Sequence, residues 1–401
     1  MEGVTVEKAA EVMRQYAAPI VRTEEVMLFD TPGRVLAQDM ISQIDNPPFD
    51  RSPIDGYACR SKDIREASKQ TPVLLSVIGE VDAGGYMETG VCSGQAVRIM
   101  TGAPVPEGCD CCVRQESTDY GENTVCIYEA VRPWGNYCYR GEDFKKGSLM
   151  VRKGTRLSYA EAGILASMGK ERVLVYQKPK IALLTTGDEV VNPGEELAPG
   201  KIYNSNQTML AVRMRELGIP PFMVQAVPDE PALMAAALKS AAEKADVIVT
   251  TGGVSVGKKD IMHEALPLLG AERIFWRVLL KPGTPTIFSV YKGIPIISLS
   301  GNPFGAAANF ELLIRPMLAK MTHDETLLPV KRTARMADTF AKASPGRRFI
   351  RAICKDGRVY MPEGLHSSGV LSSLSGCNCM VDIPSGNKGL WPGDEVQVVV
   401  L

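Results

Sequence analysis

The strongest constraint on the fold is the alternation of short apolar runs with amphipathic segments between residues 181 and about 320. Ile181 to Leu184 is a continuous apolar run, as expected for a strand buried on both faces of a sheet. Two more buried strands are expected at Asp246 to Thr251 and Ile294 to Leu299. Apolar residues at helical spacing, such as Leu210, Met214 and Leu217, lie between these runs. The alternation predicts an α/β domain with a doubly wound parallel sheet.

The flanking segments have a different pattern. Residues about 45 to 140 contain short β-type runs broken by Gly and Pro, which indicates a small β-rich module. Residues about 325 to 401 are again β-type, with a hairpin expected at Asp356-Gly357. The chain opens with an amphipathic helix behind Thr5, a candidate N-cap. Since 401 residues exceed what one core usually holds, we expect a multidomain α/β protein.

Composition narrows the class of partner. The net charge of −1 comes without a basic stripe, so a nucleic-acid partner is not expected. No stretch approaches the ~18 uninterrupted apolar residues of a membrane span, and the N-terminus lacks the apolar region of a secretory signal. We therefore expect a cytoplasmic protein without a membrane partner.

Ten cysteines raise the question of a metal or disulfide framework. Cys109, Cys111 and Cys112 form C-x-C-C, and Cys377 and Cys379 form C-x-C. Neither spacing matches the paired C-x₂-C knuckles of structural zinc sites. Reduced thiols that pack as small hydrophobic side chains are the preferred interpretation.

Loops rich in Gly, Ser and Thr follow the three predicted strands, at residues 185–189, 250–260 and 300–303. In an open parallel sheet, ligands bind outside the carboxyl ends of the strands. Glycines there let backbone N–H groups approach an anion, and a following helix N-terminus adds a favourable dipole. The three loops together predict a site for phosphate or another oxyanion, although each loop alone is equally consistent with a tight turn. They are not a P-loop or a G-x-G-x-x-G fingerprint.

Carboxylates lie beside these loops. Asp188, Glu189 and Asp260 would stand next to a bound anion, which is unfavourable unless a cation intervenes. A divalent ion such as Mg²⁺, bridging carboxylate and phosphate oxygens, explains this arrangement. The alternative is that Asp188 and Glu189 cap the turn that follows them.

Nine strings occur in order along the chain: PPFDRSPIDGYA (47–58), RIMTGAPVPEGCD (98–110), RGEDFKKG (140–147), AGILASMG (162–169), LLTTGDEVVNPG (183–194), NSNQTML (204–210), TTGGVSVGKKD (250–260), KPGTPT (281–286) and SGNPFGA (300–306). Together they resemble the motifs of the MoeA family, whose eukaryotic relatives include the C-terminal part of gephyrin. The resemblance extends from near residue 5 to the C-terminus.

The resemblance implies four domains and an activity. It implies an elongated N-terminal and dimerisation domain (1–45 and 141–178), an inserted β-rich domain (46–140), a molybdopterin-binding α/β domain (179–322) and a C-terminal β-barrel (323–401). It implies a homodimeric enzyme of molybdenum cofactor biosynthesis. In that reaction adenylylated molybdopterin and molybdate give molybdenum cofactor and AMP, with Mg²⁺ or a similar divalent cation. Molybdopterin adenylyltransferase and molybdoenzyme apoproteins are the implied partners.

The matching motifs also imply the site residues. The functional acids would be Asp55, Asp143, Glu189, Asp229 and Asp260, with Asp55 and Asp143 supplied by the partner subunit and the metal held by Glu189 and Asp260. From the residues alone, Asp229 is equally well interpreted as a helix N-cap. Substrate-binding positions would be Thr101, Thr186, Gly187, Asp188, Ser205, Asn206, Thr251, Gly252, Gly253, Ser255, Gly257, Lys281, Pro282, Ser300, Gly301, Asn302 and Pro303.

Four positions depart from the family's usual residues. Lys258 stands in place of an acid, Thr284 in place of a lysine, Ser300 in place of a proline and Gly305 in place of a serine. We expect the four to gather in one pocket. They leave open a paralogue with a tungstate preference, with altered activity, or with a role as a cofactor carrier. An adenylyltransferase is a further alternative, although such proteins usually have T-G-G-T-G where this chain has TGGVS.

Overall fold

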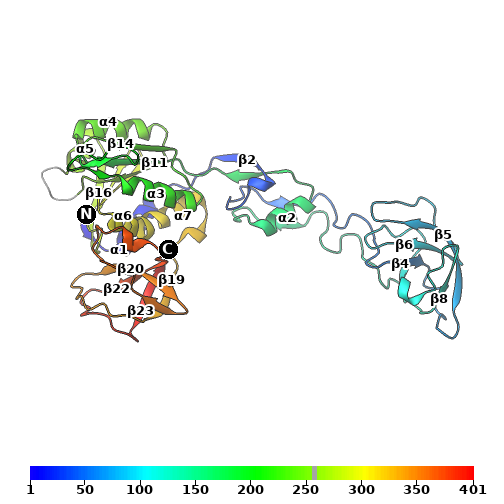
Figure 1. Cartoon of the computed structure of the whole chain (residues 1–401). Coiled ribbons are helices and arrows are strands. Elements are labelled where there is room, and N and C mark those ends of the chain that lie inside the picture. Colours follow the sequence, from blue (N-terminus) through cyan, green and yellow to red (C-terminus); the bar gives the residue numbers. More distant parts are fainter. Residues whose placement is uncertain (255–259) are drawn as a thin grey trace. The chain divides into compact units, whose positions relative to one another are not determined.

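The computed structural model describes residues 1–254 and 260–401, which form two compact units. One unit comprises residues 1–24, 33–35 and 175–401, and the other comprises residues 25–32 and 36–174. Their elements are labelled in Figure 1. Within the described residues, no helix is both long and apolar enough to cross a membrane.

A seven-stranded sheet organises the first unit. Its order is β1 (Glu2–Val4), β16 (Glu272–Val278), β17 (Ile287–Tyr291), β18 (Ile294–Leu299), β15 (Val247–Thr251), β11 (Ile181–Thr186) and β14 (Met223–Val227). Strands β18, β15, β11 and β14 are mutually parallel, which confirms the predicted α/β core. Strand β17 is antiparallel to both of its neighbours, and the alternation pattern did not predict it. It reverses into β18 through Lys292 and Gly293, whose positive φ values of 49° and 82° suit a two-residue hairpin turn.

Helices cover both faces of this sheet (Figure 1). One face packs against α1 (Val6–Tyr16), α3 (Ser205–Glu216), α6 (Pro303–Asn309), a π-helical turn η3 (Phe310–Ile314) and α7 (Arg315–Thr322). The other packs against α4 (Pro231–Ala242) and α5 (Met262–Leu269). In β11, Ile181 and Leu183 face the first layer, whereas Ala182 and Leu184 face the second. Because successive side chains point to opposite faces, a strand covered on both sides needs a continuous apolar run.

The N-terminal segment belongs to this sheet and its first helical layer. Strand β1 pairs in parallel with β16, and Ala9 and Met13 of α1 are buried in the core. The hydroxyl of Thr5 accepts a hydrogen bond from the Lys8 amide, so the N-cap predicted from the sequence is confirmed. A short parallel pair, β12 (Val190–Val191) and β13 (Ile202–Tyr203), lies in the segment that precedes α3.

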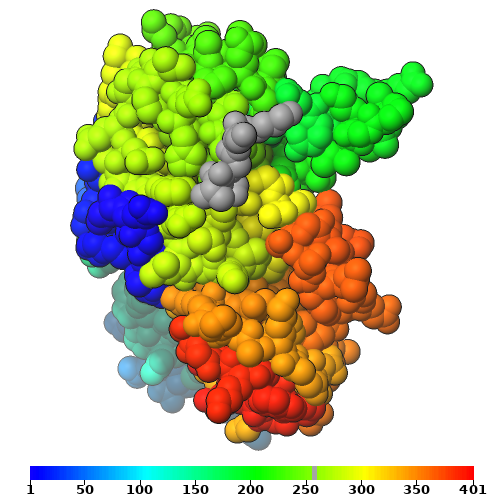
Figure 2. Space-filling view, turned by 90° about the vertical axis from the view of Figure 1, so that its left-hand side faces the viewer, coloured from blue at the N-terminus to red at the C-terminus, as the bar shows by residue number. Residues whose placement is uncertain are grey.

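The C-terminal segment of the same unit is a closed barrel. Its strands are β19 (Lys331–Met336), β21 (Arg358–Tyr360), β20 (Arg348–Lys355), β22 (Cys379–Ile383) and β23 (Glu395–Val400), with 3₁₀ turns η4 (Glu325–Leu327) and η5 (Ser372–Leu374). The hairpin expected at Asp356-Gly357 joins β20 to β21, and both residues have positive φ. In the space-filling view the orange surface of the barrel abuts the yellow-green surface of the α/β part (Figure 2).

The second unit contains a five-stranded sheet in the order β7 (Cys111–Arg114), β4 (Gly56–Cys59), β6 (Gln95–Ile99), β5 (Val73–Val81) and β8 (Thr124–Ile127). It also contains β3 (Met40–Ile41), β9 (Leu149–Val151), α2 (Tyr159–Ser167) and the 3₁₀ turns η1 (Leu28–Asp30) and η2 (Gln115–Ser117). Strands β2 (Thr23–Met27) and β10 (Arg172–Tyr176) form a separate pair. Cys59 and Cys111 lie in the apolar core of the five-stranded sheet, as free thiols that act as small hydrophobic side chains.

Candidate functional site

A pocket of about 660 Å³ lies at the carboxyl ends of β11, β15 and β18. Its wall is formed mainly by the loops that follow these strands and by the beginnings of α3 and α6. The lining residues are Thr185, Thr186, Gly187, Glu189, Val190, Ile202, Tyr203, Asn204, Ser205, Asn206, Asp229, Thr251, Gly252, Gly253, Val254, Asp260, Pro285, Ser300, Gly301, Asn302, Pro303, Gly369 and Leu371. The position agrees with the rule that ligands bind at the carboxyl edge of a parallel sheet.

Strand register brings the three loops together. Thr185 of β11 lies opposite Thr251 of β15, and Thr251 lies opposite Leu299 of β18. The Thr251 hydroxyl donates to the carbonyl of Ser300 at 3.1 Å. Asn206, in the first turn of α3, donates from Nδ2 to the Gly301 carbonyl at 2.8 Å and to Thr251 Oγ1 at 3.1 Å. Among the described residues its Oδ1 is buried without a hydrogen-bond partner, which leaves an acceptor at the pocket wall.

Close packing of the loops explains the glycine that follows β15. Gly252 has a φ of 100°, a conformation that L side chains rarely adopt. A Cβ there would lie 2.2 Å from the carbonyl oxygen of Thr186, well inside van der Waals contact. Glycine therefore allows the β15 loop to lie directly against the β11 loop.

Asp229 holds two loops together. Its Oδ1 accepts from the Thr186 hydroxyl at 2.6 Å, and its Oδ2 accepts from the Asp188 amide at 3.0 Å. In return the Asp229 amide donates to Asp188 Oδ1 at 3.2 Å. The interpretation of Asp229 as a helix N-cap is wrong, because α4 has Glu230 as its N-cap, without a side-chain capping bond. Its carboxylate is used instead across the strand ends.

Glu189 and Asp260 are the carboxylates best placed for a metal ion. Both line the pocket, and neither Lys nor Arg does so within the described residues. The same part of the chain contains no group of three His, Cys, Asp or Glu side chains arranged to enclose a metal. Mg²⁺ does not need such a cage, because it commonly binds one or two carboxylates and completes its shell with water and phosphate oxygens. The two carboxylates fit that kind of site.

Three further predicted positions, Asp188, Lys281 and Pro282, are not among the lining residues of the pocket. Asp188 contacts the pocket through Asp229, and Lys281 and Pro282 precede the loop whose Pro285 lines it. Ser255, Gly257 and Lys258 lie outside the described residues.

Of the three described positions that depart from the family pattern, only Ser300 lines the pocket, whereas Gly305 lies beside Ser300 and beside the loop that contains Thr284. A Cβ at Gly305 would lie 3.2 Å from the Gly283 amide nitrogen, beside Thr284, and 3.6 Å from the Ser300 Cβ. A side chain at position 305 would therefore press on the loop that contains Thr284. Glycine at position 305 leaves that loop room to lie against the start of α6.

The predicted residues of the second unit form two separate hydrogen-bonded groups. Asp55 Oδ1 accepts from the Thr101 amide at 2.7 Å and from the Thr101 hydroxyl at 2.8 Å. These two bonds, the backbone one first, lower the pKa of Asp55. Asp143 Oδ2 accepts from Asn46 Nδ2 at 2.8 Å. Asp55 and Asp143 belong to the second unit and the pocket belongs to the first, and the relative position of the two units is not determined.

Sequence reasoning missed Arg351, which lies on β20 with 1% exposure. Its guanidinium carbon is 4.7 Å from the centroid of the Phe304 ring at the start of α6. Its Nε donates to Ser373 Oγ and its Nη2 to the Ser367 carbonyl, so it fixes the loop that brings Gly369 to the pocket. Burial lowers the pKa of Arg351. The available signal was a lone charge within the apolar run Phe349 to Ala352.

Fold and pocket together define a class: multidomain α/β proteins with a polar pocket at the carboxyl edge of a parallel sheet. Three family models account for most of the chain. Residues 4–169 match the MoeA N-terminal region (domain I and II), residues 182–320 match a probable molybdopterin binding domain, and residues 333–401 match the MoeA C-terminal region (domain IV).

Relatives and solved structures agree. The chain is 36% identical over 386 residues to the molybdopterin molybdenumtransferase of Bacillus subtilis, covering 94% of this chain and 90% of that protein. The Staphylococcus epidermidis protein of the same name is 33% identical over 397 residues, covering 98% and 94%. A molybdopterin biosynthesis MoeA structure from Pyrococcus horikoshii superposes with a TM-score of 0.87 at 33% identity, covering 99% of each chain. The chain belongs to the MoeA family.

Proposed function

We propose that this protein is a molybdopterin molybdenumtransferase: it inserts molybdate into adenylylated molybdopterin and releases AMP in a Mg²⁺-dependent reaction. The curated relatives with this name align over more than nine tenths of the chain. The observation that carries the proposal is the strand-end pocket, in which hydroxyls, backbone amides and carboxylates converge. Molybdate and the phosphates of the second substrate are oxyanions, which such donors suit.

The chemistry follows from the lining residues. The Ser300 hydroxyl, whose oxygen accepts from the Asn302 amide, and the N-terminus of α6 would bind phosphate or molybdate oxygens. The hydroxyls of Thr186 and Thr251 already donate to Asp229 and to the Ser300 carbonyl, so they would shape the wall of the pocket. Glu189 and Asp260 would hold Mg²⁺ at the same pocket. When bound, the metal neutralises negative charge on the phosphoanhydride and so favours its cleavage. Carboxylate oxygens of Glu189 and Asp260 that do not bind the metal would orient a water molecule or a molybdate oxygen.

Asp55 and Asp143 would contribute to the site only when two subunits assemble. We place them in the site of a partner subunit within a cytoplasmic homodimer, as the family resemblance implies. The class of reaction upstream must adenylylate molybdopterin, and the product must pass to molybdoenzyme apoproteins.

The direct test is AMP release from adenylylated molybdopterin in the presence of Mg²⁺ and molybdate. We expect AMP formation that requires all three and that is lost on chelation of the metal. Running tungstate in parallel measures the oxyanion preference. Tight binding of the substrate without any AMP release would overturn the proposal and favour a carrier role.

A further inference from the structure

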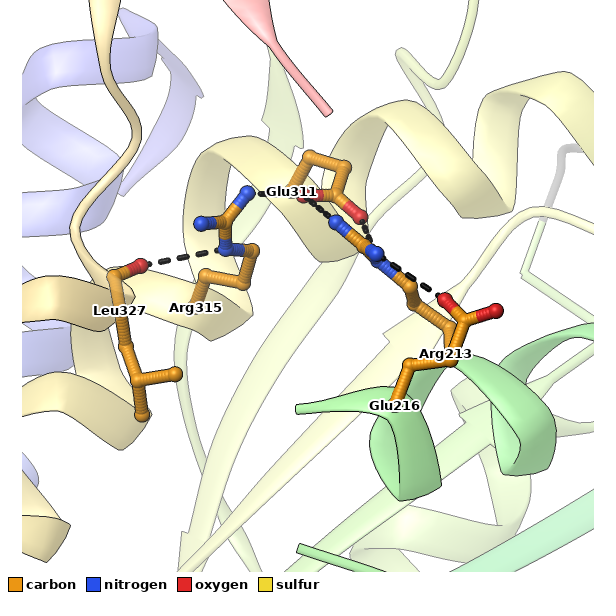
Figure 3. A network of polar contacts seen from close by, with 5 residues as sticks. All are labelled: Arg213, Glu216, Glu311, Arg315 and Leu327. Atoms are coloured by element: carbon orange, nitrogen blue, oxygen red, sulfur yellow. Dashed lines mark hydrogen bonds and ion pairs between the residues drawn. The ribbon is translucent and has the colours of Figure 1, made fainter. Parts of the chain in front are cut away.

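Three charged side chains meet where α3 packs against the α6–η3–α7 segment. Arg213 of α3 donates from Nε to Glu311 Oε1 at 2.7 Å and from Nη2 to Oε2 at 3.3 Å. Arg315 Nη1 donates to the same Oε2 at 2.6 Å, and its Nε donates to the Leu327 carbonyl at 3.1 Å. Figure 3 shows Glu311 between the two guanidinium groups. We call Arg213, Glu311 and Arg315 the charged triad.

The triad is too deeply buried to be explained as a surface ion pair. The side chains of Glu311 and Arg315 are 5% and 9% exposed, and that of Arg213 is 25% exposed. Removing such charges from water costs much of what their mutual attraction returns, so buried triads are often no more stable than apolar replacements. A role in fixing geometry is the better explanation, since each guanidinium–carboxylate contact restricts both distance and orientation.

The helix geometry shows what would be fixed. Asn206 and Arg213 are seven residues apart on α3, which is close to two turns, so they lie on one face about 10 Å apart along the axis. Asn206 contacts Thr251 and Gly301 at the pocket end of α3. Arg213 contacts Glu311 at the other end. Leu210 and Met214 bury α3 in the apolar core, and the two polar contacts fix its direction against the α6 segment near its two ends.

The π-helical turn adds to this argument. Glu311 lies within the π-helical turn η3 (Phe310–Ile314). Such turns are rare, occur mostly as single turns inside α-helices, and are frequently found at functional sites. The segment begins at Asn302 and Pro303, both of which line the pocket. The triad therefore connects two helices whose first turns form adjoining parts of the pocket wall.

We infer that the charged triad is a positioning device: it holds the first turn of α3, with Ser205 and Asn206, at the distance from the Thr251 and Gly301 loops that a phosphate-bearing substrate requires. None of the three side chains is a catalytic residue in this scheme. The identity of the substrate in this inference rests on the proposed function. The positioning of the first turn of α3 by the charged triad does not depend on it.

The central experiment replaces the whole triad by apolar residues, as Arg213→Met, Glu311→Leu and Arg315→Met together. Because no buried charge is left unpaired, we expect thermal stability close to that of the unmodified protein. We expect the KM for adenylylated molybdopterin to rise about tenfold or more, with a smaller change in kcat. Hydrogen exchange should become faster in peptides covering 203–209 and 300–306 and stay unchanged in the barrel.

A matched control is Glu216→Gln, which removes the exposed limb of the network. Glu216 accepts from Arg213 Nη1 at 3.0 Å but is 58% exposed, so we expect unchanged kinetics and exchange. If the triple variant does not fold, Arg213→Lys takes its place. Lysine keeps the charge but provides one nitrogen in place of two, and the same increase in KM and in exchange is expected.

Two further readouts separate the inference from the proposed function. Equilibrium binding of AMP with Mg²⁺ probes the pocket without turnover, and we expect it to weaken in the triad variants. An unmodified protein that binds AMP but forms none would refute the proposed function alone. Triad variants with unchanged AMP affinity and unchanged exchange at the pocket loops would refute the positioning role, whatever the catalytic result.

Discussion

Glu189 and Asp229 differ in what their carboxylates contact. Asp229 is engaged by the Thr186 hydroxyl and the Asp188 amide, so it shapes the loops. The side chain of Glu189 lines the pocket and makes no hydrogen bond or ion pair with another described residue. A metal-binding role therefore suits Glu189 better than Asp229, in keeping with the family resemblance, which implied the metal at Glu189 and Asp260 and counted Asp229 among the functional acids only.

The first prediction tests that difference. We expect Glu189→Gln and Asp260→Asn to fold normally and to reduce Mg²⁺-dependent AMP release by about 100-fold or more, because metal catalysis contributes several kcal/mol. Glu196→Gln, on the exposed loop before α3, is the control and should be fully active. Initial rates across a Mg²⁺ titration measure the effect. Rates near that of the unmodified protein in both variants would exclude these carboxylates as metal ligands.

A second residue-scale prediction concerns protonation of Asp55. Its pKa is lowered by the amide and then by the hydroxyl of Thr101, so the stability it contributes is present above its unfolded pKa and is lost as pH falls through the folded pKa. Thr101→Val removes only the hydroxyl bond. We expect the pKa of Asp55 to rise while staying below its ordinary value, as measured by NMR titration of the carboxyl carbon. No change on substitution would mean that the hydroxyl bond does not form in solution.

At the scale of elements, the strand-end loops depend on close backbone contact. Gly252→Ala would place a Cβ 2.2 Å from the Thr186 carbonyl oxygen and would strain a φ of 100°. We expect the free energy of unfolding to fall by roughly 2 kcal/mol or more, by analogy with other incompatible backbone positions. Urea denaturation measures the change. Gly346→Ala is the control, because its added Cβ meets nothing within 4 Å and the residue lacks positive φ. Equal stability of both variants would show that the loops do not pack as described.

The sequence predicted those elements whose physical cause is local. Strands β11, β15 and β18 were predicted because burial on both faces requires continuous apolar runs, and the Thr5 cap because its hydroxyl serves a neighbouring amide. The antiparallel strand β17 was not predicted, since its direction depends on a hairpin turn of ordinary composition. The contact of Asp229 with Thr186 was not predicted, and Arg351, which lies over Phe304, was missed. In both cases the partner is distant in sequence.

For the whole molecule, the proposed homodimer leads to a quantitative prediction. Asp55→Ala and Asp260→Ala subunits, each inactive alone, are mixed under conditions that exchange subunits. If each site takes Asp55 from one subunit and Asp260 from the other, every heterodimer has one intact site. Random assortment in a two-fold dimer then restores about one quarter of the unmodified activity. No recovery despite demonstrated exchange would place both acids in a site of one chain.

The four-domain division expected from the family resemblance stays a prediction. The structure divides into two compact units, and residues 1–24 pack with the α/β sheet, while the resemblance assigned residues 1–45 to the elongated domain. Family models end and begin at 169 and 182 and again at 320 and 333, close to the expected transitions near 178 and 322.

The pairing of β1 with β16 has a consequence for how the protein is made. Glu2 lies beside Trp276, so β1 is synthesised about 270 residues before its partner strand, a delay of roughly 15 to 50 s at ordinary elongation rates. The second unit, nearly all of which lies within residues 36–174, has its strand partners much sooner. We therefore expect the inserted unit to fold first during synthesis, while the apolar face of α1 stays exposed to chaperones until the α/β sheet is complete.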